Sequence, residues 1–215
     1  MRIFKGNYDK KKEIISKYNS TATFYDKRYR KIQEEKFRIM LNDFQLEKNK
    51  RILDAGCGSG LLLEFIVKIF KINQIKFLNY IGIEISLNML KSFADKCRNL
   101  NNNLNVNLIL SDIEHLPFRN NKIDSIFSIT SLQNLPNIFR GVIEILRVGK
   151  HMANLQFSIL KKNLDLDSLI SNLKLPDTTM IAVSALRGWG LDKLTAKILE
   201  FLDHNSNIYA NKHNE

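Results

Sequence analysis

The sequence contains little cysteine and little proline: two Cys and three Pro occur among its 215 residues. Cys57 and Cys97 do not form a Cys-x-x-Cys pair, which argues against a disulfide framework and against a cysteine zinc site. The four histidines also lack the spacing of metal ligands. We therefore predict no bound metal.

Long apolar stretches are absent as well. No apolar run is long enough to cross a bilayer, so we expect no membrane span. The basic N-terminal stretch has neither an apolar core nor a small-residue cleavage site, so we find no secretory signal. Together with the sparse cysteines, this favours a cytoplasmic location.

The charge balance is strongly basic, with a formal net charge of +11. A basic protein attracts phosphate polyanions, which makes RNA a candidate partner. However, the basic residues are dispersed and accompany many Asn and Ile residues, a bias that an AT-rich genome also produces. No Arg-rich or RNP-type motif is present, so RNA binding is not the favoured interpretation.

From about residue 50, short β-rich runs alternate with longer helical patterns. Strands are predicted at 50–54, 79–84, 106–111, 123–130, 155–160, 179–184 and 207–210. Helices are predicted at 61–70, 87–100, 137–148 and 191–202. The alternation predicts an α/β domain with parallel strands and crossover helices.

The first fifty residues are predicted to be helical. Ser20 is expected to cap a helix that runs towards Phe44 and carries one apolar stripe. Upstream of this stripe, Tyr18, Tyr25 and Tyr29 recur at helical spacing. These tyrosines could cover a site or pack in the core, and the sequence favours neither.

A glycine-rich segment, RILDAGCGSG, follows the first predicted strand. The strand ends in Asp54, and Gly56, Gly58 and Gly60 alternate before the next helix. Glycines are needed where the backbone takes positive φ or approaches a ligand closely. Because the helix behind them presents free N–H groups, a nucleotide cofactor is the expected occupant. The G-x-G-x-G spacing differs from the dinucleotide pattern G-x-G-x-x-G.

Two acidic residues follow later strands. Glu84 ends the second strand, where a carboxylate can accept hydrogen bonds from both ribose hydroxyls, and Ser86 is expected to cap the next helix. Asp112 follows the third strand in the segment SDIEHLPF. Asp124 opens the fourth strand and is expected to be structural.

Taken in order, these segments resemble the motifs of class I S-adenosylmethionine (SAM)-dependent methyltransferases, over roughly residues 18–160. LDAGCGSG resembles the family's LDxGCGxG, GIEIS its GxDxS, SDIEHLPF its xxDxxxLPF, and KIDSIFSITSL its fourth strand. The similarity is greatest to the small-molecule group of ubiquinone and menaquinone biosynthesis. In that group, the stretch after the fourth strand often contains histidine, where this chain has Gln133 and Asn134.

The resemblance implies a Rossmann-like, seven-stranded, mostly parallel sheet with helices on both faces. It also implies an N-terminal helical lid at residues 1–48 and a SAM-binding core at 49–215. In this family, the adenine amino group donates to the carboxylate at the position of Asp112. The cofactor-binding residues are then Asp54, Gly56, Cys57, Gly58, Gly60, Glu84, Ile85, Asp112, Ile113 and Thr130. Tyr25, Tyr29 and Gln133 are the candidates for the methyl acceptor, and no catalytic residue is assigned.

Three functions remain open at this point. The chain could methylate a small molecule; it could methylate RNA or protein, with a small activator subunit as partner; or it could bind SAM without catalysis. NKID at 121–124 and SAL at 184–186 resemble GTPase segments, but the phosphate-binding G-x-x-x-x-G-K-[ST] loop is absent from the sequence. Trp189, in the loop that contains SAL, is expected at the rim of the acceptor pocket.

Overall fold

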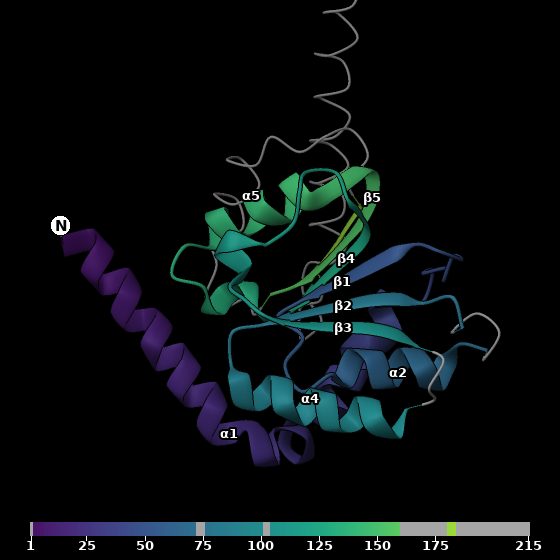
Figure 1. Cartoon of the computed structure of the whole chain (residues 1–215), viewed down its shortest axis with the longest axis horizontal. Helices are drawn as coiled ribbons and strands as arrows, with labels where there is room; N and C mark the ends of the chain where they lie inside the picture. The colour runs from purple at the N-terminus through teal and green to yellow at the C-terminus, as the bar shows by residue number, and fades with distance from the viewer. Residues whose placement is uncertain (1, 72–75, 101–103, 160–179, 184–215) are drawn as a thin grey trace, which may run out of the picture.

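The computed structural model describes residues 2–71, 76–100, 104–159 and 180–183 (Figure 1). These residues form one parallel sheet of six strands in the order β3-β2-β1-β4-β5-β6. The strands are β1 (Arg51–Ala55), β2 (Asn79–Glu84), β3 (Asn105–Leu110), β4 (Ile123–Ile129), β5 (Gly149–Ser158) and β6 (Met180–Val183). The predicted α/β class and parallel pairing are confirmed.

The strand order reverses at the centre of the sheet. β1 pairs with β2 on one side and with β4 on the other, so the chain winds outwards in both directions from β1. At such a switch point the connections leave the sheet on opposite faces and open a crevice at the carboxyl ends of the strands. The fold therefore places a site where β1 and β4 end.

Helices cover both faces of the sheet (Figure 1). α2 (Leu61–Ile69) and α4 (Leu87–Asn99) lie on one face, and α5 (Ile138–Val148) lies on the other. Each face has its own apolar cluster: one packs α5 against β4 and β5, and the other packs α2 and α4 against β1 and β2. Two short 3₁₀ turns, η1 (Ile113–His115) and η2 (Leu132–Asn134), follow β3 and β4.

The N-terminal helix α1 (Arg2–Met40) covers most of the first fifty residues, which were predicted to be helical, but it is one unbroken helix that ends at Met40. Ser20 does not cap a helix but lies inside α1, where its hydroxyl donates to the carbonyl of Lys17. The predicted start at Ser20 is wrong because the preceding residues contain no proline and continue the helix without a break. The predicted apolar stripe is confirmed, since its members are buried against α2 and the sheet: Phe37, Met40, Leu41 and Phe44.

An ionic cluster fixes the middle of α1 to the helices beneath it. Arg30 donates to Asp26 and to Glu64 of α2, at 3.1 Å in each case. Lys96 of α4 contacts the same two carboxylates. Because one carboxylate comes from α1 and the other from α2, the two cations join three helices at one point. Isolated surface pairs contribute little, but a shared network is a stronger constraint.

The second half of the sheet differs from the prediction in detail. β5 starts at Gly149, well before the predicted 155–160. Its first residues are largely polar and do not show a strand pattern, and its pairing with β4 shifts register between Ile123 and Ser125. Met152 there has a φ of 66°. The predicted seventh strand (207–210) and last helix (191–202) lie outside the described residues, as does Trp189. Among the described residues, no helix is long and apolar enough to cross a membrane.

Candidate functional site

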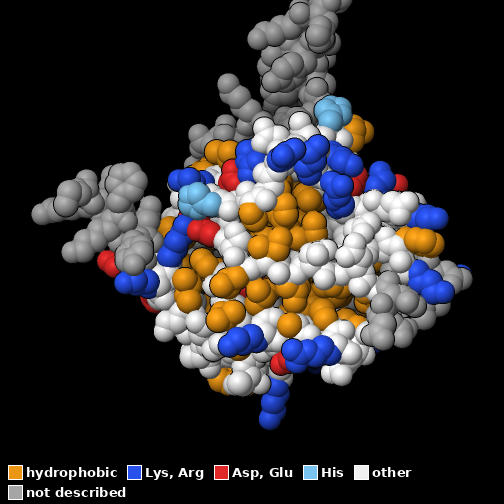
Figure 2. All heavy atoms as spheres, viewed as in Figure 1, with side chains coloured by type: hydrophobic (Ala, Val, Ile, Leu, Met, Phe, Trp, Pro, Cys, Tyr) orange, Lys and Arg blue, Asp and Glu red, His pale blue; other side chains and the backbone are white. Residues whose placement is uncertain are grey.

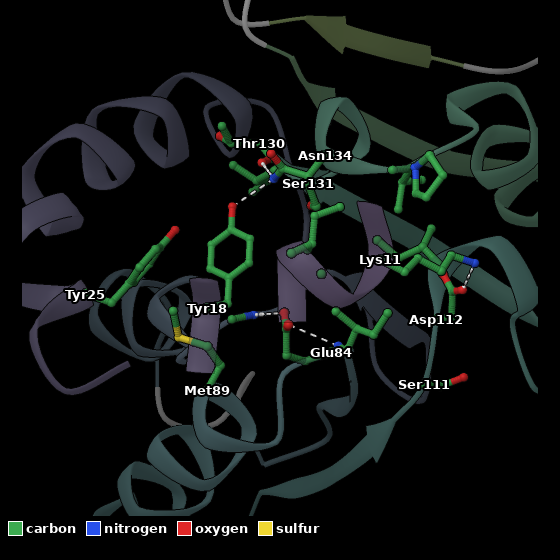
Figure 3. Close-up of a pocket in the computed structure, with 18 residues that line it drawn as sticks. Lys11, Tyr18, Tyr25, Glu84, Met89, Ser111, Asp112, Thr130, Ser131 and Asn134 are labelled. Atoms are coloured by element: carbon green, nitrogen blue, oxygen red, sulfur yellow. Dashed lines mark hydrogen bonds and ion pairs between the residues drawn. The ribbon is translucent and has the colours of Figure 1, made fainter. Parts of the chain in front are cut away.

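A cavity lies at the carboxyl ends of β1, β2 and β4, beneath α1 (Figure 3). It joins five segments that are far apart in the sequence: α1, the glycine loop, the end of β2, the turn after β3 and the turn after β4. Of the predicted cofactor residues, the lining includes Gly56, Gly58, Glu84, Ile85, Asp112, Ile113 and Thr130. Seven of the residues singled out by the motifs therefore surround one space.

The glycines of the loop serve different purposes. Gly56 and Gly60 have φ of 88° and 83°, and an added Cβ would come within 2.4 Å of Ser131 and 2.1 Å of Phe93 respectively. These two positions are required by packing. Gly58 also has positive φ, but a Cβ there would meet no atom within 4 Å. Its open side faces free space beside the cavity, so it is the glycine that leaves room for a ligand.

Glu84 ties the glycine loop to the second strand and to α4. Its carboxylate accepts hydrogen bonds from the backbone N–H groups of Gly58 (3.0 Å), Ile85 (3.0 Å) and Ser86 (2.9 Å). Burial raises the pKa of Glu84, and the three N–H donors act in the opposite direction. A carboxylate has about four lone-pair positions, so an acceptor position remains for a ligand hydroxyl. The predicted cap is confirmed: Ser86 accepts from the N–H of Met89 at 3.2 Å.

Asp112 lies at the opposite wall, where β3 ends. One oxygen accepts from the N–H of Glu114 at 2.9 Å and thereby starts η1. The other forms an ion pair with Lys11 of α1, which also contacts Glu114. Burial lowers the pKa of Lys11, but the two carboxylates outweigh this and the net pKa is raised. Lys11 therefore stays charged and fastens α1 to this wall, with Ile113 buried beside it.

Thr130 closes the cavity where β4 ends, in a backbone conformation that β-branched residues rarely adopt. Its φ is 60°, and its carbonyl accepts from the side-chain amides of Gln133 (2.8 Å) and Asn134 (3.2 Å). Its hydroxyl accepts from Nζ of Lys36 at 2.7 Å. Non-glycine residues held at positive φ cluster at functional sites, where the surrounding contacts hold the strain.

Of the three residues predicted to contact the methyl acceptor, only one lines the cavity. Tyr25 lines the cavity, whereas Tyr29 packs against Tyr25 outside the lining, with 4.8 Å between the two ring centroids. The structure also places Gln133 outside the lining, because its amide turns back to Thr130. Its neighbour Asn134 faces the cavity instead and donates to the hydroxyl of Tyr18 at 2.8 Å (Figure 3).

Lys11 was missed by the sequence analysis, although a signal for it exists. Lys11, Tyr18 and Tyr25 recur every seven residues and so share one face of α1, which lines the cavity. The lysine is hidden in the run KKK, where it looks like a solvated charge. Only its two carboxylate partners, about a hundred residues away, reveal its position.

Three predicted residues lie beneath or beside the cavity. Gly60 is buried under Phe93, and Cys57 is buried with its pKa raised by desolvation, so its thiol is not a ready nucleophile. Asp54 lines a second, smaller cavity and accepts a hydrogen bond from the Tyr80 hydroxyl at 2.5 Å. Burial raises the pKa of Asp54 to about 7, against the hydrogen bond from Tyr80.

Within the described ranges, no group of three or more His, Cys, Asp or Glu side chains could hold a metal ion. His115 is exposed and lies 3.5 Å from Asp112. Asp124 stands at the other end of the sheet, where it accepts from the N–H of Arg51 (2.9 Å) and from Lys150 (2.7 Å). These contacts join the starts of β1, β4 and β5 and are structural.

The sequence is similar to those of known methyltransferases. Residues 53–155 match the family described as a methyltransferase domain. The chain is 26% identical over 148 residues to a demethylmenaquinone methyltransferase of Staphylococcus carnosus, which covers 67% of this chain and 58% of the relative. It is 28% identical over 167 residues to the ubiquinone/menaquinone biosynthesis C-methyltransferase of Rickettsia typhi, covering 74% and 67%. The chain spans only about half the length of several curated relatives.

A solved structure shows the same fold. A protein from Methanococcus maripaludis, described as an S-adenosyl-L-methionine-dependent methyltransferase, superposes with a TM-score of 0.54 at 18% identity. The match covers 72% of this chain and 68% of that one. At this identity, the likeness concerns the arrangement of the sheet and helices only.

The raised pKa of Asp54 predicts a pH-dependent stability. The ordinary pKa is 3.8 and the folded value about 7, so the stability contributed by protonated Asp54 is complete below about pH 4 and is lost as pH rises through 7. Asp54→Asn removes this dependence. Between pH 5 and pH 8, the free energy of unfolding of the wild type should fall relative to that of Asp54→Asn by about 2–3 kcal/mol. Urea unfolding of both proteins at the two pH values measures this, and a difference that does not change with pH would contradict it.

Proposed function

We propose that this chain, which belongs to the class I SAM-dependent methyltransferases, transfers a methyl group from SAM to a small-molecule acceptor by in-line displacement. One observation carries the proposal: the glycine loop, Glu84 and Asp112 surround a single cavity at the switch point of a parallel sheet. Nucleotide cofactors bind at such points. The sequence similarity to quinone-biosynthesis methyltransferases supports the same conclusion.

The residues around the cavity fit the parts of SAM. The open side of Gly58 leaves space for the ligand, and Glu84 keeps an acceptor position for a ribose hydroxyl. Asp112, with the N–H of Ile113, would hold the adenine. Asp112 is paired with Lys11, so the adenine amino group would share its carboxylate with that lysine or displace it. Apolar side chains supply the rest of the wall, among them Met89, Ile129 and Leu135.

The chemistry required of the protein is mainly positioning. When bound, SAM supplies a methyl group on a positively charged sulfonium, which is a strong donor. The protein must hold the acceptor in line with the S–CH₃ bond, and such orientation contributes about 7–11 kcal/mol. Tyr18 and Tyr25 of α1 border the space for the acceptor. Burial raises the pKa of both phenols, so their hydroxyls orient the acceptor as neutral groups.

The shape of the cavity favours a small acceptor over RNA or protein. α1 lies across it, and half of the residues that line it are apolar or tyrosine. On the face shown in Figure 2, Lys and Arg side chains lie in separate groups around a hydrophobic area, instead of forming one basic surface. The second candidate, an RNA- or protein-directed methyltransferase with an activator subunit, needs such a surface at the cavity mouth.

We also propose that residues 1–48 act as a lid over the 49–215 core, with the first half of α1 as its movable part. The second half of α1 is held by the ionic cluster and by Phe37 and Met40 in the core. The first half is held mainly by polar contacts, such as those of Lys11 and of Tyr18. Polar contacts at a surface are exchanged for water more readily than a buried apolar stripe. A lid of this kind excludes water and completes the acceptor pocket.

The proposed reaction predicts which fraction of a cell extract acquires label. Purified protein is incubated with methyl-labelled SAM and with separate small-molecule, RNA and protein fractions. Label should enter the small-molecule fraction, and heat-inactivated protein is the control. Incorporation into RNA or protein alone would favour the second candidate function.

Replacing Glu84 and Asp124 by their amides separates the cofactor site from the structural end of the sheet. Glu84→Gln should weaken the binding of S-adenosylhomocysteine about tenfold or more, because hydrogen bonds to a charged acceptor contribute roughly 1.5–3 kcal/mol each. Asp124→Asn should leave the affinity unchanged, since Asp124 joins the starts of β1 and β4. Calorimetric titration of both folded variants decides this, and equal affinities would show that the ribose site is misplaced.

Removing the first half of α1 tests the lid. A chain without residues 2–24 loses Lys11 and Tyr18 but keeps Asp26, Arg30 and the buried stripe. Its circular dichroism should be that of a folded α/β protein, its affinity for S-adenosylhomocysteine should fall, and methyl transfer should nearly disappear. Full transfer activity in the shortened protein would show that this segment is not a lid.

A further inference from the structure

Lys36 is a buried cation without a charged partner among the described residues. It lies on the inner face of α1, where its side chain is only 4% exposed overall. Burial lowers its pKa, and none of the ion pairs between described residues includes it. Its Nζ donates one hydrogen bond, to the Thr130 hydroxyl. An ammonium group has three N–H donors, and burying a charge is costly unless it is paired.

The Thr130 hydroxyl is thereby prepared to donate in its turn. Because its oxygen accepts from Lys36 at 2.7 Å, its own proton can point to another acceptor. Thr130 lines the main cavity, and the contacts of its carbonyl hold it in place. Lys36 and Thr130 together offer positive charge and a hydroxyl donor at one point, which suits a carboxylate.

A group of the opposite polarity lies one turn away. Gln33 is 8% exposed, and its amide oxygen Oε1 is buried without a hydrogen-bond partner. Gln33 lines the smaller cavity together with Asp54, and this cavity shares Tyr25, Gly56 and Gly58 with the main one. An unpaired amide oxygen and a carboxyl group suit a cation, such as an ammonium group.

We infer that Lys36, with Thr130, binds the carboxylate of an α-amino-acid group and that Gln33 accepts from its ammonium, so that α1 holds the amino-acid end of the cofactor. This inference rests on the proposed function. It explains why a lysine and a glutamine are buried in a helix whose other inward residues nearby are apolar. It also makes α1 part of the cofactor site, in addition to its place over the acceptor.

The test compares three ligands that differ only at this end: S-adenosylhomocysteine, its decarboxylated analogue, and 5′-methylthioadenosine, which lacks the whole amino-acid portion. Calorimetric titration of the full chain should show that the wild type prefers S-adenosylhomocysteine to the decarboxylated analogue by about tenfold or more, as expected for a charged hydrogen-bonding group. Lys36→Met should abolish that preference and leave the affinity for 5′-methylthioadenosine unchanged. Thr130→Val should reduce the preference, and Thr130→Ser, which keeps the hydroxyl, should retain it.

Lys31→Met is the matched control, because Lys31 lies on the exposed side of the same helix. Thermal unfolding of each variant establishes that it is folded. If Lys36→Met weakened the affinity for all three ligands equally, Lys36 would have a purely structural role and the inference would be overturned. An unchanged preference of Lys36→Met for S-adenosylhomocysteine over the decarboxylated analogue would overturn it too. Failure of the wild type to bind any of the three would instead refute the proposed cofactor, and the inference with it.

Discussion

The site depends on three hydrogen bonds that backbone N–H groups donate to one carboxylate. Glu84 accepts hydrogen bonds from the N–H groups of Gly58 in the glycine loop, Ile85 at the end of β2 and Ser86 at the start of α4. Ile85 and Ser86 follow Glu84 directly in the chain, whereas Gly58 lies 26 residues earlier, so the carboxylate joins the distant glycine loop to the end of β2. Each N–H would be an unsatisfied donor at the start of a helix or turn if the carboxylate were absent. The carboxylate therefore fixes the loop conformation that leaves the open side of Gly58 beside the cavity, and it does so before any ligand is bound.

The sequence was most informative where local chemistry determines the structure. The bounds of β2 and the capping of α4 by Ser86 could be predicted closely, because a short run with Tyr and Ile and a cap residue are local signals. The clustering of Gly56, Glu84 and Asp112 followed from the parallel order of the strands. The start of α1 was placed wrongly, because Ser20 is a typical cap residue and only a few apolar residues before it, such as Ile14 and Tyr18, mark the buried face.

The same limit applies to the charged residues of α1. Lys11 and Lys36 are indistinguishable from solvated lysines in a sequence with 33 Lys and Arg residues. One is paired with Asp112 and Glu114, and the other is buried beneath Thr130. Both positions are set by contacts with residues about a hundred positions away. The seven-residue spacing places Lys11 on the same face of α1 as Tyr18 and Tyr25, but it does not identify the partners of either lysine. For Gln133 and Asn134 the choice between facing the cavity and turning away depends on η2, a single turn whose rotation no pattern specifies.

The position of α1 also has a consequence for the order in which the chain folds during synthesis. The apolar stripe of α1 shares a cluster with Phe127 and Ile129 of β4, so it cannot be fully covered until β4 has been made and inserted beside β1. Chains grow at about 5–20 residues per second, so Phe37 and Met40 stay exposed for several seconds while the nearly ninety residues between α1 and the end of β4 emerge. During that interval, an amphipathic helix precedes an incomplete sheet, and this is the stage at which a nascent chain is most exposed to aggregation and most in need of a chaperone.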